Sequence, residues 1–468
     1  MTENAYSPER VKYLSLLAEQ FSTFHELCME IINLSGVLSL PKGTEHFMSD
    51  IHGEYEAFYH ILNNCSGVVR EKVQLWLGDH LTQQGISELC TLIYYPSEKL
   101  RLLREAGVTT DEWYRKTLTD LVYLARKLSS KYTRSKVRKA MPSDFAYILD
   151  ELLHAQTDED DNQHQYHETI LDTLLDIKNG NAFIIALSAL IKRLAVDRLH
   201  VVGDIFDRGP RADSILDMLM EHHSVDIEWG NHDILWMGAA SGSLCCIAAV
   251  VRNCLAYNNM QILENGYGIP LRPLTLFAEK LYPDLTPEKA ALQAVSIMMF
   301  KLEGQLIKRN PSFQMEDRLL LERISPAQKT VEMDNYVWPI RDIALPTIDW
   351  ADPYALTEEE QEVMNGLQDA FLHSLRLRTH VEFLYTRGRL YRRYNGNLLF
   401  HGCIPLDENG EFLEKQMGNQ TLSGKALMDY ADSMARKAYF TGRQDALDFM
   451  WYLWCGDDSP VCGRKIKT

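Results

Sequence analysis

Two segments of this sequence place acidic and basic side chains directly after a short apolar run. The first, EHFMSDIHG, ends in Asp50 and His52, and the second, LHVVGDIFDRGP, carries Asp204, Asp207 and Arg208. A buried strand commonly delivers polar residues to a site at its carboxyl end. In the first segment the two-residue period of a strand directs Asp50 and His52 to one face, which suits two ligands of one metal ion.

The same arrangement occurs twice more along the chain. SVDIEWGNHD supplies Asn231 and His232, and NLLFHGC supplies His401. Each motif alone is a weak signal, and an alternative is an ordinary strand-to-loop turn whose polar groups are satisfied locally. Together the four motifs predict a single site, because each supplies a different part of the same chemistry.

That chemistry is the hydrolysis of a phosphate ester by two divalent cations. Such a pair, about 3.5–4 Å apart, clamps a phosphate and activates a bridging water. We predict that Asp50, His52 and Asp204 hold the first cation. Asp204, Asn231 and His401 hold the second, with the Asp204 carboxylate as the bridge. Since this ligand set lacks a thiolate, it favours manganese, iron or zinc.

Three further residues are expected to act on the substrate. Arg208 binds phosphate oxygens, because a planar guanidinium matches a phosphate bidentately. His232 protonates the leaving alkoxide, and Asp207 orients its imidazole.

A basic segment, KYTRSKVRKAMP, interrupts an otherwise acidic chain. The formal net charge is −17, so an anionic substrate needs a locally positive site. Two interpretations of the segment stay open, a solvated helix face and an anion-binding site. Its cationic residues are Lys131, Arg134, Lys136, Arg138 and Lys139.

Bulk composition excludes several classes of protein. The 468 residues correspond to about three domain-sized units, and the hydrophobic fraction of 46% supports a sizeable core. No apolar run reaches the roughly 18 residues of a membrane helix, and MTENAYSPER does not resemble a signal peptide. The nine cysteines lack a CxxC pair, which indicates a reduced, cytoplasmic protein. The acidic balance disfavours nucleic acid as a partner.

Helical and extended segments are expected around the motifs. Residues 8–35 predict one amphipathic helix that packs on the core or on a partner subunit, which is compatible with a homo-oligomer. A strand, a loop and a helix are expected over 46–62. Further helices are expected over 181–196 and 212–222. Residues 397–400 predict a strand before His401.

The order DxH, GDxxDRG, GNHD and HG resembles that of the calcineurin-like metallophosphoesterases. The longer segments KGTEHFMSDIHGEYEAF, HVVGDIFDRGPRADSILD, EWGNHDILWMGAASG and LLFHGCIP resemble the bacterial class III fructose-1,6-bisphosphatases over nearly the whole chain. This resemblance implies an α/β fold, with two mixed sheets flanked by helices and large helical insertions. It also implies hydrolysis of fructose 1,6-bisphosphate to fructose 6-phosphate in gluconeogenesis, with manganese as cofactor. In that context we predict that Arg134 and Arg138 contact a sugar phosphate.

The resemblance also gives expected domain boundaries. Residues 1–40 form the N-terminal helix, and 41–78 with 179–262 form the metallophosphatase core. Residues 79–178 are a helical insertion with the basic segment, 263–394 are a second insertion, and 395–468 continue the core. The family pattern continues into a Gly-His-x-Pro motif whose histidine completes the second metal site. We expect the chain to be truncated before that motif.

Two alternatives accompany the predicted sugar bisphosphatase. The same core serves phosphoprotein and dinucleotide phosphatases, since a fold does not determine a substrate. The second alternative is that the chain is an inactive remnant that binds metal or partner subunits.

Overall fold

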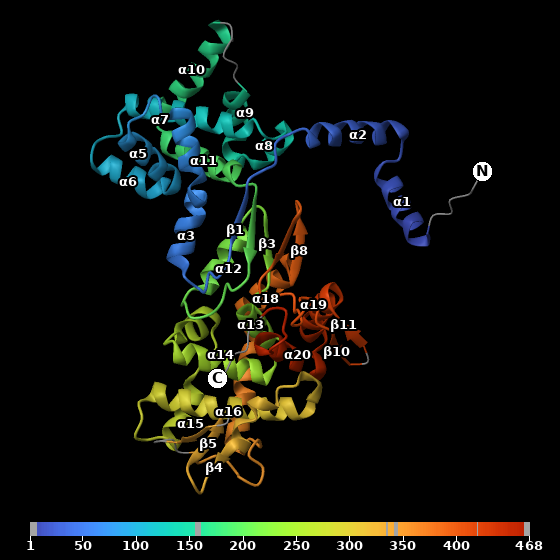
Figure 1. Ribbon diagram of the computed structural model, residues 1–468. Helices are drawn as coiled ribbons and strands as arrows, with labels where there is room; N and C mark the ends of the chain where they lie inside the picture. The colour runs from blue at the N-terminus through green and yellow to red at the C-terminus, as the bar shows by residue number, and fades with distance from the viewer. Residues whose placement is uncertain (1–6, 155–160, 334–335, 341–344, 419, 463–468) are drawn as a thin grey trace, which may run out of the picture. The chain divides into compact units, whose positions relative to one another are not determined.

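The structure is a computed structural model that describes residues 7–154, 161–333, 336–340, 345–418 and 420–462 (Figure 1). The chain divides into two compact units. We call Met1–Glu45 with Ile61–Arg198 the helical unit, and His46–His60 with Leu199–Thr468 the sheet unit. Among the described residues, no helix has the length and apolar character needed to cross a membrane.

The helical unit is built around two packed helices, α7 (Asp111–Ser129) and α11 (Gly180–Ala195). In α7, apolar residues recur every three or four positions, and Leu118, Leu121 and Leu124 are fully buried. Leu187 and Leu190 of α11 are also fully buried. The later helices of this unit are α4 (Val68–Leu77), α5 (Gln83–Tyr94), α6 (Pro96–Glu105), α7 (Asp111–Ser129), α8 (Arg134–Ala140), α9 (Ala146–His154), α10 (Asp161–Asp176) and α11 (Gly180–Ala195).

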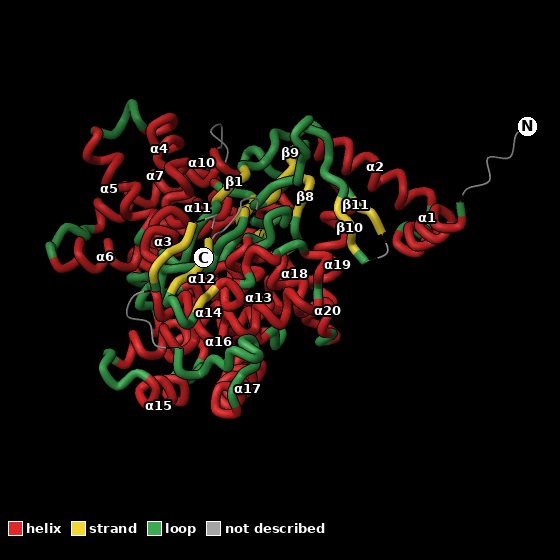
Figure 2. The backbone as a smooth tube through the Cα atoms, turned by 60° about the horizontal axis from the view of Figure 1, so that its bottom comes forward, coloured by secondary structure: helices red, strands yellow, loops and turns green. Residues whose placement is uncertain are grey.

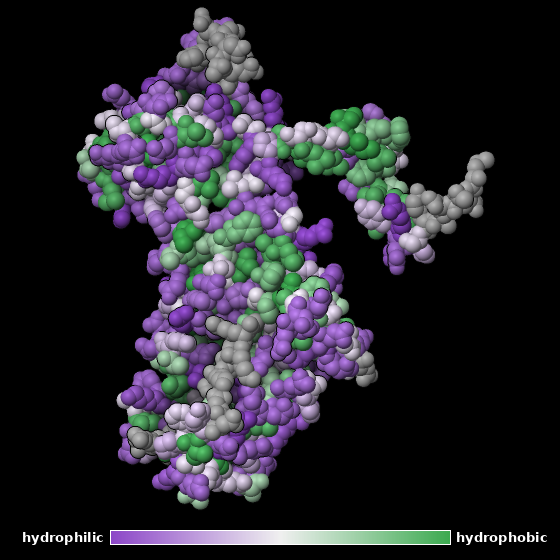
Figure 3. Space-filling view, in the orientation of Figure 1, coloured by the Kyte–Doolittle hydropathy of each residue, from purple (hydrophilic) through white to green (hydrophobic). Residues whose placement is uncertain are grey.

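The predicted single helix over 8–35 is wrong, because the segment forms two helices, α1 (Pro8–Gln20) and α2 (Phe24–Leu38). Thr23 separates them: its hydroxyl accepts the Glu26 N–H while the Glu26 carboxylate accepts the Thr23 N–H. This reciprocal cap starts a new helix. Neither helix has a buried residue, and Figure 3 shows apolar side chains gathered on the surface of α2.

The sheet unit contains a four-stranded sheet in the order β1-β2-β3-β7. Its strands are β1 (Glu45–Met48), β2 (Arg198–Val202), β3 (Val225–Glu228) and β7 (Gly388–Arg389). The β2–β3 and β3–β7 pairs are parallel, so the chain leaves these strands at the same edge. A three-stranded antiparallel sheet has the order β4 (Ile324–Ser325), β5 (Thr330–Met333) and β6 (Tyr336–Pro339). Two antiparallel ribbons pair β8 (Tyr391–Tyr394) with β9 (Asn397–Phe400) and β10 (Lys415–Met417) with β11 (Gln420–Leu422).

Helices make up most of the remaining sheet unit, as Figure 2 shows by the excess of helix over strand. Helix α13 packs against α14 and α20, and α14 packs against α16. The protein is therefore mixed α/β with short strands, which confirms the α/β class. The principal helices are α12 (Ala212–Glu221), α13 (Asn231–Ala240), α14 (Leu244–Ala256), α15 (Arg272–Leu281), α16 (Pro287–Arg309), α17 (Glu358–His373), α18 (Leu375–Arg387), α19 (Gly424–Thr441) and α20 (Gln444–Cys455).

Most of the elements predicted around the motifs are confirmed. Strands β1, β2, β3 and β9 precede the four motifs. Helix α3 (Tyr55–Asn64) follows the first motif, α12 follows the second, and α13 begins within the third.

Candidate metal and phosphate site

The first motif reaches the site through its backbone conformation, and the expected strand geometry is wrong. Strand β1 ends at Met48, so Asp50 and His52 do not alternate along a strand. Their φ angles of 53° and 51° are left-handed, which costs a non-glycine residue about 1–2 kcal/mol each. Hydrogen bonds to the second motif stabilise this conformation. The N–H of Asp50 donates to Gly203 O at 3.1 Å and that of His52 to Asp204 O at 2.8 Å.

Glycines permit the close approach of the second, third and fourth motifs. Gly203 has φ 79°, and a Cβ there would lie 2.5 Å from Nδ1 of His401. A Cβ on Gly230 would lie 2.1 Å from Oδ1 of Asp204. Any larger residue at either position would displace a candidate ligand.

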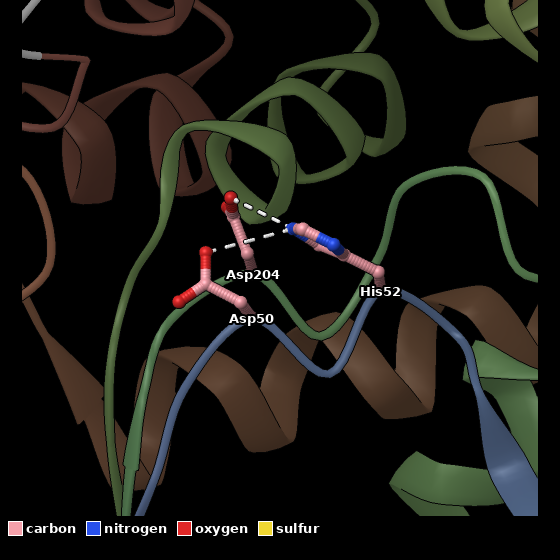
Figure 4. A group of neighbouring side chains, drawn as sticks. All are labelled: Asp50, His52 and Asp204. Atoms are coloured by element: carbon pink, nitrogen blue, oxygen red, sulfur yellow. Dashed lines mark ion pairs between the residues drawn. The ribbon is translucent and has the colours of Figure 1, made fainter. Parts of the chain in front are cut away.

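Asp50, His52 and Asp204 each place one ligand atom within 4.8 Å of the others, as Figure 4 shows. Nε2 of His52 lies 3.7 Å from Oδ1 of Asp50 and 3.5 Å from Oδ2 of Asp204. Two carboxylates and an imidazole are ligands that divalent transition metals accept. The three predicted ligands of the first cation are therefore brought together, and they form a candidate metal site.

His401, directly after β9, lies close to the same carboxylate of Asp204. Its Nε2 lies 3.3 Å from Oδ2 of Asp204, and its Nδ1 lies 2.8 Å from the carbonyl oxygen of Val202. Donation from Nδ1 to that carbonyl leaves Nε2 as the ligand atom, which is the arrangement usual for a metal-binding histidine. Asn231, the third predicted ligand of the second cation, is buried at the first position of α13.

Burial and hydrogen bonding perturb these groups in opposite directions. Burial disfavours the charged form of Asp204, but hydrogen bonds to His401 and His52 outweigh it and hold the Asp204 pKa well below its usual value. Burial lowers the pKa of His401, whereas its contact with Asp204 raises it to about 9. Asp204 is thus an ionised carboxylate between two imidazoles, and a cation would take the place of the protons that they share.

The predicted substrate-directed residues also meet. Nδ1 of His232 lies 3.3 Å from Oδ1 of Asp207, and Nε of Arg208 lies 3.5 Å from Oδ2 of Asp207. Burial lowers the pKa of His232, opposed by the carboxylates of Asp204 and Asp207. The Arg208 side chain is 59% exposed, so it is accessible to a ligand.

Sequence reasoning assigned no role to Asp233, which lies at the centre of the site's backbone. It is fully buried, and its Oδ2 accepts N–H groups of Asp204 at 2.9 Å and Gly230 at 3.0 Å. Its Oδ1 accepts those of Ile205 at 2.9 Å and Phe206 at 3.2 Å. Asp233 therefore fixes the loop that carries Asp204. The only sequence signal was its position within GNHD.

A second buried side chain supports the same loop. Nδ2 of Asn259 donates to the carbonyl oxygen of Gly209 at 2.8 Å. The N–H of Gly209 in turn donates to His52 O at 2.8 Å. No motif pointed to Asn259, because it follows the end of α14 and lies 50 residues along the chain from Gly209.

The two arginines of the basic segment belong to the helical unit, whereas the residues above belong to the sheet unit. Both lie on α8 and are exposed. Nε of Arg138 is 3.6 Å from Oδ2 of Asp150. A role of Arg134 and Arg138 in substrate binding stays a prediction.

Residues 12–468 match the sequence model of the Firmicute fructose-1,6-bisphosphatase family. The chain belongs to this family. A class 3 fructose-1,6-bisphosphatase of Clostridium acetobutylicum is 47% identical over an alignment that covers 100% of this chain and 74% of the relative. The corresponding enzyme of Clostridium novyi is 47% identical, with coverage of 98% and 72%. That of Clostridium botulinum strain Loch Maree is 46% identical, with the same coverage. No solved structure matches this member of the family.

Proposed function

We propose that this chain hydrolyses fructose 1,6-bisphosphate to fructose 6-phosphate and phosphate. The names of its relatives support fructose 1,6-bisphosphate as the substrate, and residues 12–468 match the family's sequence model. The observation that supports the chemistry is the position of Asp204, whose Oδ2 lies 3.5 Å from His52 and 3.3 Å from His401. A carboxylate between two sets of nitrogen and oxygen ligands suits a bridge between two cations.

The proposed metal ligands are those assigned from the sequence. Asp50, His52 and Asp204 hold one cation, and Asp204, Asn231 and His401 hold the other. Two cations held by these residues would supply Lewis-acid activation of the phosphate and of a water molecule. We propose manganese as the metal, since the donor set of carboxylate, amide and imidazole suits it.

The chain's own residues then handle the phosphate and the proton. Arg208 binds phosphate oxygens, because its exposed guanidinium offers a bidentate pair of donors. Asp207 orients His232 by the 3.3 Å contact with Nδ1. When the His232 ring is protonated on both nitrogens, its Nε2–H is left to give a proton to the departing sugar oxygen.

We also propose the fold of the core, the metabolic role of the enzyme and its cellular location. The metallophosphatase core, with the domain boundaries predicted from the sequence, is a calcineurin-like sandwich, and the enzyme serves gluconeogenesis. The nine scattered cysteines lack a CxxC pair, which supports a reducing, cytoplasmic location.

Phosphate release from fructose 1,6-bisphosphate with added manganese tests this function. The unchanged chain should release phosphate, and Asp204→Asn should lower kcat/KM at least about 100-fold, since metal activation contributes several kcal/mol. Asp369→Asn is the matched control, because that carboxylate is 76% exposed on α17. A folded chain that releases no phosphate with manganese, iron or zinc would contradict the proposal.

A charge-reversal variant tests the basic segment separately. Arg134→Glu with Arg138→Glu should raise KM for fructose 1,6-bisphosphate. An unchanged KM would refute a role of these two arginines in substrate binding.

A further inference from the structure

A cavity of about 670 Å³ lies within the sheet unit and is lined by four arginines from β7, β8 and α19. We call it the arginine pocket; its arginines are Arg389, Arg392, Arg393 and Arg436. Four guanidinium groups around one cavity are unusual in a chain whose formal net charge is −17. The question is which of these charges the protein itself uses.

Arg436 serves the fold. Its guanidinium donates to the carbonyl oxygens of Tyr385 at 2.8 Å and Gly388 at 2.9 Å, and its Nε donates to Asp432 at 2.6 Å. It also lies 5.0 Å from the centre of the Trp229 ring. These contacts tie α19 to α18 and the start of β7.

Arg392 is compensated by buried acids. Its Nε lies 3.5 Å from Oδ1 of Asp226 and 3.5 Å from Oε1 of Glu228, both on β3. Asp226 is 1% exposed and Glu228 is 0% exposed, so their charges need a close cation. Arg392 therefore balances the buried face of β3.

Among the described residues, Arg389 and Arg393 have no acid within ion-pair distance, although the charge of Arg389 acts on Glu228 and opposes the rise of its pKa. Both are exposed, and neither side chain makes a hydrogen bond or ion pair with another residue of the described chain. The two carboxylates that line the pocket are already satisfied. Asp429 accepts from the Tyr391 hydroxyl at 2.8 Å and pairs with Lys425, and Asp432 pairs with Arg436. The pocket thus retains two guanidinium groups for a ligand.

The backbone of the pocket lies beside the segments that carry two candidate metal ligands. The carbonyl oxygen of Arg389 accepts the N–H of Trp229 at 3.0 Å, two residues before Asn231. Tyr391 pairs with Phe400 across the β8–β9 ribbon, one residue before His401. The pocket therefore adjoins, through the backbone, the segments that carry Asn231 and His401.

We propose that the arginine pocket binds a phosphate group carried by a small molecule, through Arg389 and Arg393. This rests on the proposed function for one source, the phosphate of the sugar bisphosphate that is not cleaved. The other source is a separate phosphorylated molecule. The chemistry is the same in both, because paired guanidinium groups recognise a phosphate by bidentate, charge-assisted hydrogen bonds.

The test uses Arg389→Ala, Arg393→Ala and the double variant of the full chain with manganese. Arg272→Ala is the matched control, an exposed arginine of the same unit at the start of α15. Kinetics are measured with fructose 1,6-bisphosphate and with p-nitrophenyl phosphate, which has a single phosphate. Thermal unfolding is measured with and without inorganic phosphate, so that the pocket is tested even if the chain does not hydrolyse the sugar.

Each outcome decides the proposal. The pocket is assigned to the second substrate phosphate if two results are found for the double variant. Its KM for the bisphosphate rises at least tenfold, and its kcat/KM falls by a factor at least ten times larger for the bisphosphate than for p-nitrophenyl phosphate. Unchanged KM values with a smaller phosphate-induced rise in Tm than the control assign it to a separate phosphorylated molecule. Equal losses for both substrates, or no change in KM and in the phosphate-induced Tm shift, overturn the proposal. An unchanged chain that is inactive while its phosphate-induced Tm shift depends on the two arginines refutes the proposed function alone.

Discussion

Replacing Asp233 by asparagine tests how strongly the site depends on a residue that supports its loop but is not a candidate metal ligand. The carboxylate accepts four backbone N–H groups, two on each oxygen. An asparagine has one acceptor oxygen and one amide group that only donates. Whichever way the amide is turned, two of the four N–H groups face a donor instead of an acceptor.

The cost follows from the number of donors left without a partner. A buried unsatisfied donor costs about 1–3 kcal/mol, so two cost about 2–6 kcal/mol. The net loss of stability is smaller than this sum, because a neutral amide avoids the cost of burying a charge. That cost is visible in the pKa of Asp233, which burial and the charge of Asp204 raise to about 6. We expect Asp233→Asn to lower the free energy of unfolding by about 2–4 kcal/mol.

Urea unfolding monitored by circular dichroism measures this loss, and manganese binding measures its effect on the site. The control is Asp111→Asn, an exposed aspartate at the first position of α7. This change removes a helix-terminal charge from a carboxylate that does not accept converging backbone N–H groups as Asp233 does. Asp233→Asn should also weaken manganese binding, because Asp204 lies on the released loop. A free energy of unfolding within about 0.5 kcal/mol of the control, with unchanged manganese affinity, would refute the reasoning.

Three further predictions concern the proton donor, a glycine and a buried acid. His232→Asn should lower kcat for fructose 1,6-bisphosphate about 10²–10⁴-fold but affect p-nitrophenyl phosphate much less, because p-nitrophenolate leaves without a proton. Gly203→Ala should weaken manganese binding and destabilise the fold, since the new methyl would contact His401, whereas Gly366→Ala on α17 has open space and should stabilise by about 1 kcal/mol. Burial raises the pKa of Glu303 to about 7. Its contribution to the free energy of unfolding is therefore fully present below pH 4.5 and falls by up to about 3 kcal/mol as the pH rises to 7. Urea unfolding across this pH range should show that Glu303→Gln removes this fall.

The controls for these variants are equally specific. Equal losses for the two substrates in His232→Asn would exclude a role in protonating the leaving group. A Gly203→Ala variant that binds manganese like Gly366→Ala would show that His401 does not need the close approach. Glu288→Gln, at an exposed position of α16, should leave the pH dependence of stability as it is in the unchanged chain, and a Glu303→Gln variant that behaves like it would contradict the raised pKa.

The sequence alone determined the local elements that bring the site together. Short apolar runs followed by glycine predicted β1, β2, β3 and β9, because side-chain burial and glycine breaks act over a few residues. It also selected Asp50, His52 and Asp204, which the structure brings within ligand distance of one another. Residue type and order indicated which residues are the candidate ligands, but not the backbone conformation that brings them together.

Only the tertiary structure decided how those residues meet. The left-handed conformation of Asp50 and His52 depends on hydrogen bonds to Gly203 and Asp204, which are about 150 residues away along the chain. Contacts between distant segments likewise include three of the four N–H groups that converge on Asp233 and the pairing of Arg392 with buried acids of β3. Local patterns do not encode such contacts, because the free energy of burying a polar group is set by whichever partner the complete fold brings to it.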